Sequence, residues 1–291
     1  MPELPEVETI ARGADRRVRG DRILAAWFSS YPQPFKTSPR DQAAGLEGRE
    51  ILSVHRTGKH IVCELGPAGP SATSASGNQK TRSKSGRAPA AQWIVHLGMT
   101  GRLLVATPED PIAPHTHARL TLASGRELRF VDPRRFGRLE FRNLADTQQF
   151  AGPGAEPLDV ETADLVSLFR GRKLAVKSAL LNQSLLAGVG NIYADESLFR
   201  AGIRPTRQAG RLTRAELSRL RKALREVLTK AIRLGGSSVS DYVDAEGSPG
   251  FFQLEHRVYR RTGEACRRCG TAIRRIVLGG RGTHYCPNCQ R

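Results

Sequence analysis

Four of the five cysteines form two pairs near the end of the chain, in the pattern Cys266-x2-Cys269-x16-Cys286-x2-Cys289. Two such pairs at this separation can present four thiolates tetrahedrally to one zinc ion, as in a ribbon built from two hairpins. A short terminal segment buries little apolar surface, so the metal would supply much of its folding free energy. The spacing therefore predicts one structural zinc ion, and the odd cysteine count argues against a disulfide scaffold.

The chain is strongly basic, with a formal net charge of +18 over 291 residues. Such an excess destabilises a compact chain by self-repulsion unless a polyanion is a regular partner, and nucleic acid is the leading candidate. An anionic membrane surface is the alternative. No stretch approaches about 18 consecutive apolar residues, however, and no basic helix has a wide apolar face. We therefore expect a nucleic-acid partner and no membrane. The first residues also lack the pattern of a secretory signal, so we expect a cytoplasmic protein.

The first half of the chain is patterned as strands. A short helix is predicted to precede them, because Pro5 suits a first helical turn and apolar residues then recur at helical spacing as far as Gly20. Apolar alternation over residues 23–141 predicts an antiparallel sandwich or barrel. Within it, residues 66–91 are rich in Gly, Pro, Ser, Ala and basic side chains, which predicts a disordered basic loop.

The second half is patterned as helices after a linker rich in Gly and Pro. The clearest helix begins at Thr213, which forms a capping box with Glu216, and stops before Gly235. We therefore expect an α+β protein with a leading helix and an antiparallel β-sandwich, a helical domain and a zinc-ribbon-like finger. The expected boundaries are 1–142 for the sandwich, 143–159 for the linker, 160–256 for the helical domain and 257–291 for the finger.

The amino terminus carries an unusual set of groups in Pro2-Glu3-Leu4-Pro5-Glu6-Val7-Glu8. If Met1 is removed, Pro2 gains a secondary amine whose pKa lies near about 7.7–8.0 in model peptides, so a useful fraction is neutral and nucleophilic. Glu3 lies beside it and can move protons. Taken alone, these residues favour a frayed terminus that leads into a helix.

Two further features are open on spacing alone. The segment Gly188-Val189-Gly190-Asn191 precedes a helix, so its amides can cradle an anion, but a plain interhelical turn fits equally well. Its glycines do not match a P-loop or a dinucleotide fingerprint. Arg281, between the cysteine pairs, could approach a phosphate, although a solvated charge is the commoner role for an isolated arginine.

Five motifs, in order from end to end, together resemble the bacterial formamidopyrimidine-DNA glycosylase family. They are residues 2–8, 96–101 (His-Leu-Gly-Met-Thr-Gly), 132–137 (Asp-Pro-Arg-Arg-Phe-Gly), 188–194 (Gly-Val-Gly-Asn-Ile-Tyr-Ala) and the two cysteine pairs. The resemblance implies a bifunctional repair enzyme. It would excise 8-oxoguanine and formamidopyrimidines from duplex DNA and then nick the strand by β- and δ-elimination.

The same resemblance implies an architecture and a setting. The helical domain would be a helix-two-turn-helix domain, and residues 237–259 would form a mobile loop that covers the flipped purine. The partner would be damaged double-stranded DNA. We further expect a monomer with no small-molecule cofactor, associated with the nucleoid. The loop at residues 66–91 departs from the family, which typically has a short turn there.

Carried over by resemblance, Pro2 would attack C1′ of the damaged nucleotide through a Schiff base, Glu3 would help to open the deoxyribose, and Glu6 would support them. Lys59, matching the family's lysine on the strand after its first hairpin, and Arg281 join this catalytic set. With His96 and Asn191 they would bind phosphates beside the lesion.

A second group would hold the opened duplex. Met99, Arg134 and Phe136 resemble the residues that fill the space left by the flipped base. Lys173 is added as a further DNA contact. Without the resemblance, Met99 and Phe136 would be interpreted as core residues.

Two alternatives compete with this interpretation. An endonuclease VIII-like enzyme for oxidised pyrimidines has the same fold, but Leu4 and the intact Arg134-Arg135-Phe136 argue against it. A noncatalytic zinc-ribbon DNA-binding protein belongs to another functional class. The presence of Pro2, Glu3 and Lys59 argues against that second alternative.

Overall fold

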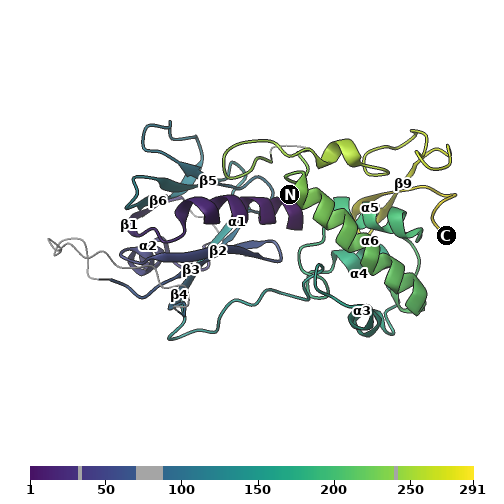
Figure 1. Cartoon of the computed structure of the whole chain (residues 1–291), viewed down its shortest axis with the longest axis horizontal. Coiled ribbons are helices and arrows are strands. Elements are labelled where there is room, and N and C mark those ends of the chain that lie inside the picture. The colour runs from purple at the N-terminus through teal and green to yellow at the C-terminus, as the bar shows by residue number, and fades with distance from the viewer. Residues whose placement is uncertain (32–34, 70–87, 239–241) are drawn as a thin grey trace. The chain divides into compact units, whose positions relative to one another are not determined.

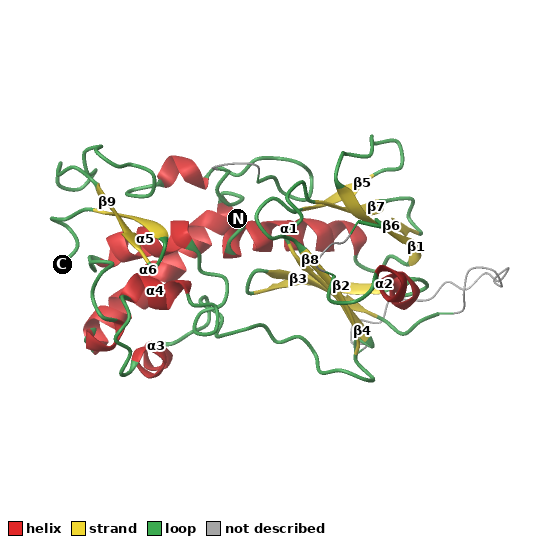
Figure 2. Ribbon diagram, turned by 180° about the vertical axis from the view of Figure 1, so that it is seen from behind, coloured by secondary structure: helices red, strands yellow, loops and turns green. Residues whose placement is uncertain are grey.

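The computed structural model describes residues 1–31, 35–69, 88–238 and 242–291 (Figure 1). Most of the predicted loop 66–91, and three residues of the predicted lesion-covering loop, lie outside the described residues. The chain forms two compact units. The first consists of residues 1–2, 6–151 and 238–250, and the second of residues 3–5, 152–237 and 251–291. Strands predominate in the first unit and helices in the second (Figure 2).

Helix α1 spans Leu4–Val18 and has one apolar face. Pro5 suits its first turn because proline has no amide hydrogen to leave unpaired and a preset φ. Apolar side chains then recur every three or four residues, as on any helix that covers a core. The members of this face are all buried: Leu4, Val7, Ile10, Ala11, Ala14 and Val18. The helix predicted from this spacing is confirmed.

The first unit contains two four-stranded antiparallel sheets. One has the order β1-β6-β7-β5 and the other β2-β3-β4-β8. Their bounds are β1 Ile23–Phe28, β2 Ile51–Thr57, β3 His60–Leu65, β4 Ala91–His96, β5 Arg102–Ala106, β6 Thr116–Leu122, β7 Glu127–Val131 and β8 Arg138–Asn143. The predicted sandwich is therefore confirmed.

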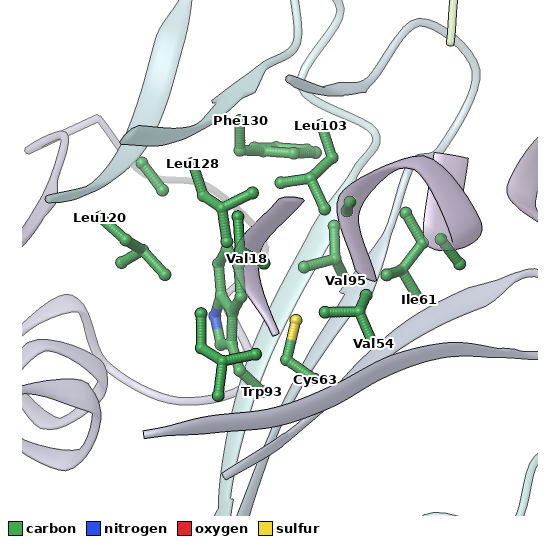
Figure 3. Close-up of a cluster of buried hydrophobic side chains, with 14 of the residues drawn as sticks. Val18, Val54, Ile61, Cys63, Trp93, Val95, Leu103, Leu120, Leu128 and Phe130 are labelled. Atoms are coloured by element: carbon green, nitrogen blue, oxygen red, sulfur yellow. The ribbon is translucent and has the colours of Figure 1, made fainter. Parts of the chain in front are cut away.

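The sandwich core combines side chains from both sheets and from α1. Leu103, Leu128 and Phe130 of one sheet face Trp93 and Cys63 of the other, with Val18 of α1 in the same cluster (Figure 3). Helix α2 (Pro39–Leu46) packs at one end, where the buried Gln42 accepts a hydrogen bond from the indole N–H of Trp93 at 3.1 Å. The buried indole N–H of Trp93 thus has its hydrogen-bond partner within the core.

The second unit is built on a helical core. Its α-helices are α3 (Thr162–Phe169), α4 (Val176–Leu181), α5 (Asn191–Ala201) and α6 (Arg214–Arg233), with short 3₁₀ turns η2 (Ala209–Arg211) and η3 (Phe252–Glu255). The predicted capping box at Thr213 is confirmed, because its hydroxyl accepts from the Glu216 amide while the Glu216 carboxylate accepts from the Thr213 amide. No helix in the described ranges is long and apolar enough to cross a membrane.

The zinc ribbon closes the second unit. Strands β9 (Arg274–Leu278) and β10 (Arg281–Tyr285) pair as a hairpin between the two cysteine turns. The four Sγ atoms lie within 4.8 Å of one another, with Cys266 and Cys289 at 4.0 Å and Cys269 and Cys286 at 3.5 Å. A tetrahedral zinc site with Zn–S bonds of about 2.3 Å needs sulfur separations of about 3.8 Å, far longer than a disulfide. The four thiolates therefore fit one structural zinc ion, as the spacing predicts.

Chelation is expected to unfold the ribbon and leave the sandwich folded. Beyond its cysteines, the ribbon's buried cluster has only Phe199, Val258 and Ile273, whereas the sandwich has its own extensive core. The chain has two tryptophans, Trp27 and Trp93, and both lie in the sandwich strands. Tryptophan fluorescence should therefore stay unchanged when a chelator lowers binding to duplex DNA, and added zinc should restore binding. A single shared unfolding transition would contradict this.

Candidate catalytic and DNA-binding sites

Glu3 is held against the amino terminus of α5. Its carboxylate is buried, with 4% of the residue exposed, and accepts hydrogen bonds from the Ile192 amide at 3.1 Å and the Tyr193 amide at 3.4 Å. The first amides of a helix have no partners within the helix, and its dipole favours a negative charge there. Glu3 is therefore fixed as an oriented acceptor rather than a mobile surface acid.

The glycine pair before α5 leaves the space that Glu3 and Leu4 occupy. A Cβ on Gly190 would lie 2.2 Å from Cδ of Glu3, and one on Gly188 would lie 2.9 Å from Cβ of Leu4. Gly188 also has a φ of 98°, which side chains other than glycine rarely adopt. Spacing alone left this loop as either an anion cradle or a plain turn. In the structure, the anion at this position is the Glu3 carboxylate, which is bound by amides of the first turn of α5.

Pro2 lies next to Glu3 in the chain and is buried, while Met1 before it is 48% exposed. An exposed first residue is accessible to an aminopeptidase, and removing it would create the secondary amine on Pro2. Glu6 is also buried, and its backbone carbonyl lies 3.5 Å from the hydroxyl of Tyr242. Burial, and then the charge of Glu6, raises the pKa of that hydroxyl.

Lys59 and His96 lie in the same sheet region of the first unit. Lys59 occupies the two-residue turn between β2 and β3, not a strand, and is almost completely buried. Burial, and then the charges of Lys59 and Arg138, lowers the pKa of His96 to about 4. Its Nδ1 accepts a hydrogen bond from the Gly98 amide at 3.1 Å, so the neutral ring carries its proton on Nε2. His96 is therefore a neutral donor at pH 7.

A pocket beside His96 has two cationic side chains, Lys36 and Arg138, and one acid, Glu140, which lies 3.5 Å from Lys36. It has a volume of about 320 Å³ and is lined by Lys36, His60, Ile94, His96, Phe136, Arg138 and Glu140. The imidazoles of His60 and His96 lie 4.8 Å apart. Such a lining is suited to an anion in contact with the sheet.

Met99, Arg134 and Phe136 project from two loops that Asp132 joins. The fully buried Asp132 carboxylate accepts from the Thr100 hydroxyl at 2.6 Å and from the Gly137 amide at 2.7 Å. Met99 is 42% and Phe136 51% exposed, and the guanidinium of Arg134 lies 4.9 Å from the Phe136 ring centroid. Two large apolar side chains at the surface contradict a core role for them, and the sequence motifs did not single out Asp132 as their anchor.

Asn191 and Arg281 come together in the second unit. Asn191 is the first residue of α5 and its side-chain amide donates to the Gly282 carbonyl at 3.0 Å. Arg281, next to Gly282, begins β10 and is exposed. Lys173 is exposed in the segment between α3 and α4.

A buried ion pair beneath this site was missed by sequence reasoning. Lys177 lies 2.7 Å from Asp195, and both side chains are fully buried. Lys177 also donates to the Gly282 carbonyl and the Thr283 hydroxyl, both at 2.9 Å. The other Asp195 oxygen accepts from the amide and Nδ1 of His284 at 2.8 and 3.2 Å. Burial lowers the pKa of Lys177, and Asp195 opposes that shift.

Lys177 of α4, Asp195 of α5 and His284 of β10 together fix β10 to the two helices. His284 completes the network through its backbone amide and its ring. The sequence did contain a sign of this ion pair. Lys177 and Asp195 each lie three residues before a leucine, on the face of a short helix that apolar residues share. Glu196 is likewise structural here, because its buried carboxylate accepts from the amides of Arg257, Val258 and Tyr259.

Three family models match consecutive parts of the chain. The formamidopyrimidine-DNA glycosylase N-terminal domain matches residues 1–139 and its H2TH domain matches residues 152–243. The zinc finger found in FPG and IleRS matches residues 263–291.

Curated relatives match over their whole length. The formamidopyrimidine-DNA glycosylase of Solibacter usitatus is 44% identical over 291 residues, and that of Thioalkalivibrio sulfidiphilus is 42% identical over 295, each covering 100% of both chains.

Solved structures give the same result. A Lactococcus lactis FPG mutant in complex with DNA containing Fapy-dG has a TM-score of 0.85 at 33% identity, covering 100% of both chains. The MutM (FPG) protein of Thermus thermophilus has a TM-score of 0.81 at 40% identity, covering 99% of this chain and 98% of that one. The chain therefore belongs to the formamidopyrimidine-DNA glycosylase family and is a DNA glycosylase of base-excision repair.

Proposed function

We propose that this glycosylase excises oxidised purines, 8-oxoguanine and formamidopyrimidines, from duplex DNA and then cleaves the strand as an AP lyase. The observation that carries the proposal is the Glu3 carboxylate, buried and oriented by two amides directly beside Pro2 in the chain. The Lactococcus lactis relative bound to Fapy-dG DNA supports the same substrate class.

The proposed chemistry starts at the amine of Pro2 after Met1 is removed. Its lone pair forms a bond to C1′ of the flipped nucleotide, and the base leaves with the electrons of the glycosidic bond and takes up a proton. Glu3 takes up the proton that the Pro2 nitrogen loses on attack and then delivers it to the ring oxygen, as the acid, when the deoxyribose opens to a cationic iminium. Glu6 supports this site.

The iminium then makes strand cleavage possible. Its positive charge acidifies the C2′ proton, and loss of that proton expels the 3′-phosphate by β-elimination. A second proton loss expels the 5′-phosphate by δ-elimination. Hydrolysis of the remaining adduct returns the Pro2 amine, so no oxidant and no small-molecule cofactor is required.

Four residues are proposed to bind phosphates beside the lesion: Lys59, His96, Asn191 and Arg281. Lys173 is proposed as a further contact. Of the four, only Lys59 and Arg281 are cations at pH 7. At about −0.9 per neutralised phosphate, they should together contribute about −1.8 to the slope of the logarithm of the binding constant against the logarithm of salt concentration. The basic pocket beside His96 supports a phosphate position there.

Met99, Arg134 and Phe136 are proposed to fill the space of the extruded base. Extruding a base costs a few kcal/mol, and an exposed wedge that occupies the vacancy lowers that cost. The guanidinium of Arg134 can hydrogen-bond the edge of the orphaned base. The anchoring of both loops through Asp132 supports a preorganised wedge.

The oligomeric state, the partner and the location in the cell are proposed on the basis of this activity. The enzyme would act as a monomer on damaged double-stranded DNA in the cytoplasm, associated with the nucleoid. We also propose the domain limits 1–142, 160–256 and 257–291, with 143–159 as the linker.

Borohydride trapping tests the amine mechanism. Reduction during incubation with a duplex that contains 8-oxoguanine is expected to give a covalent complex that maps to Pro2, because the iminium is reducible. The enzyme should first be shown by mass spectrometry to lack Met1. No complex from such an enzyme would reject the Pro2 amine as the nucleophile.

Lesion choice is a separate measurement. Excision of 8-oxoguanine opposite cytosine should exceed that of thymine glycol opposite adenine. Equal or inverted rates would contradict the proposed preference for oxidised purines.

Gly190→Ala is expected to lower base excision by at least about 100-fold, the lower range for losing a positioned acid or base. The backbone of Gly190 has a φ of −127°, which alanine adopts freely, so the effect would come from the contact with Glu3. Adding Glu3→Gln to this variant should cost little more, because both changes act on one group.

The matched control is Gly66→Ala, whose Cβ would meet its neighbours at 3.7 Å. That variant should excise at the wild-type rate. Affinity for a duplex containing a tetrahydrofuran abasic analogue should stay within about threefold in both variants, since this measures DNA binding without chemistry. Wild-type excision by Gly190→Ala would contradict the role of the Glu3 position.

The stability of the sandwich is expected to fall as pH drops from about 6.5 towards 4. The folded-state pKa of His60 and of His96 is lowered to about 4, mainly by burial, so protonation favours the unfolded chain below the unfolded value of about 6.5. Above about pH 6.5 the two histidines are neutral in both the folded and the unfolded chain, so they no longer lower the free energy of unfolding. Urea unfolding monitored by tryptophan fluorescence should show a shallower pH dependence in His96→Gln than in the exposed control His115→Gln. The same pH dependence of unfolding free energy in the two variants would contradict a lowered pKa of His96 in the folded state.

A further inference from the structure

A second pocket lies in the helical unit, and none of the residues proposed to contact the lesion lines it. It has a volume of about 370 Å³ and lies between α5, α6, η3 and the first cysteine turn. Its floor is apolar and aromatic, formed by the buried side chains of Phe199, Val227 and Phe252. A volume of a few hundred Å³ with an apolar floor and a few polar groups is typical of small-molecule sites.

The rim of this pocket has more positive than negative groups available to a ligand. Five basic residues line it: Arg200, Lys230, Arg257, Arg267 and Arg268. Arg200 pairs with Glu226, and Lys230 pairs with Glu255 at 2.6 Å. The third acid, Glu196, is occupied by backbone amides.

Three guanidinium groups form no salt bridge with a carboxylate among the described residues, those of Arg257, Arg267 and Arg268. All three residues are exposed at the rim. Lys230, and then the charges of Arg257 and Arg267, lower the pKa of Glu255, so one carboxylate faces three cations there. Arg268 lies over the ring of Phe199, with its Cζ 5.4 Å from the ring centroid. The charges thus converge on one side of an aromatic floor.

We propose that this pocket binds a phosphate monoester attached to a planar ring, as in a nucleoside monophosphate. Guanidinium forks match the oxygens of a phosphate and form charge-assisted hydrogen bonds with it. A flat ring can stack on the planar guanidinium of Arg268, which lies over Phe199 above the apolar floor. In such a ligand the phosphate would bind the arginines of the rim, and the flat ring would lie over the apolar floor.

The site is separate from the proposed lesion contacts on α5. Asn191 begins this helix and Arg200 is nine residues further on, which is about 13 Å along the axis at 1.5 Å per residue. Two sources can supply the same chemistry. One is a free mononucleotide and the other is the 5′-phosphorylated end of a DNA strand.

Binding of 2′-deoxyguanosine 5′-monophosphate to the zinc-loaded full chain tests the proposal by calorimetry, without any need for excision activity. The nucleotide should bind at least about tenfold more tightly than deoxyguanosine, as expected for lost charge-assisted hydrogen bonds. Arg257→Ser, and separately Arg267→Ser with Arg268→Ser, should each weaken nucleotide binding by about tenfold. Arg257 lies outside the cysteine turn, so its variant tests the pocket without altering the neighbours of a zinc ligand.

The matched control is Arg211→Ser with Arg214→Ser, which removes two exposed arginines of the same unit that do not line the pocket. It should bind the nucleotide within about twofold of wild type. Equal affinities for nucleotide and nucleoside, or equal losses in the control and the pocket variants, would overturn the proposal.

Short duplexes with 5′-phosphate or 5′-hydroxyl ends distinguish the two sources. A preference for the phosphorylated end that Arg257→Ser abolishes would identify the strand end as the ligand. Nucleotide binding with no such preference would identify the free nucleotide. Binding of acetyl-Asp-Asp-Asp-Phe that depends on Arg257, with no nucleotide binding, would assign the pocket to acidic peptides and reject the phosphate ligand.

Discussion

The contact between the Glu3 carboxylate and the first amides of α5 is the interaction on which the candidate active site depends. It gives the helix terminus the negative charge that its dipole favours, and it orients the carboxylate of the residue that follows Pro2 in the chain. The contact is possible only because Gly190 has no side chain, since a Cβ there would overlap the carboxylate. Glu3 and the glycine loop before α5 are some 190 residues apart in sequence, yet they fit together as direct neighbours in the structure.

The buried pair of Lys177 and Asp195 has a related role in the second unit. Burying two charges costs several kcal/mol per ion, so such a pair contributes little net stability, whereas removing one partner costs about 3–5 kcal/mol. Its value lies in geometry, because Lys177 and Asp195 bind three consecutive residues of β10, Gly282 to His284. Asn191 bonds the first of them, and Arg281 directly precedes it. The pair thus holds β10 against α5 at the point where two proposed phosphate contacts meet.

The positive charge of the chain serves more than one purpose. Some basic residues are tied into the structure, as Lys177 is, and others pair with neighbouring acids, as Arg200 does with Glu226. The arginines at the second pocket that form no salt bridge among the described residues remain available to a ligand. Net charge indicated a polyanionic partner correctly as a class, but it could not separate these three roles, because each depends on which acids lie nearby.

Local patterns were sufficient to predict the zinc ligands, the strands, the leading helix and the capping box of α6, because spacing along the chain determines which side chains share a turn or a face. The motifs of residues 2–8, 96–101, 132–137 and 188–194 were likewise sufficient to indicate the family. Tertiary structure alone decided that Asp132 joins two loops, that His284 bonds Asp195, that His96 is neutral, and that three arginines surround an aromatic floor. Each of these depends on groups distant in sequence that approach within a few ångströms, and on burial, which neither periodicity nor composition encodes.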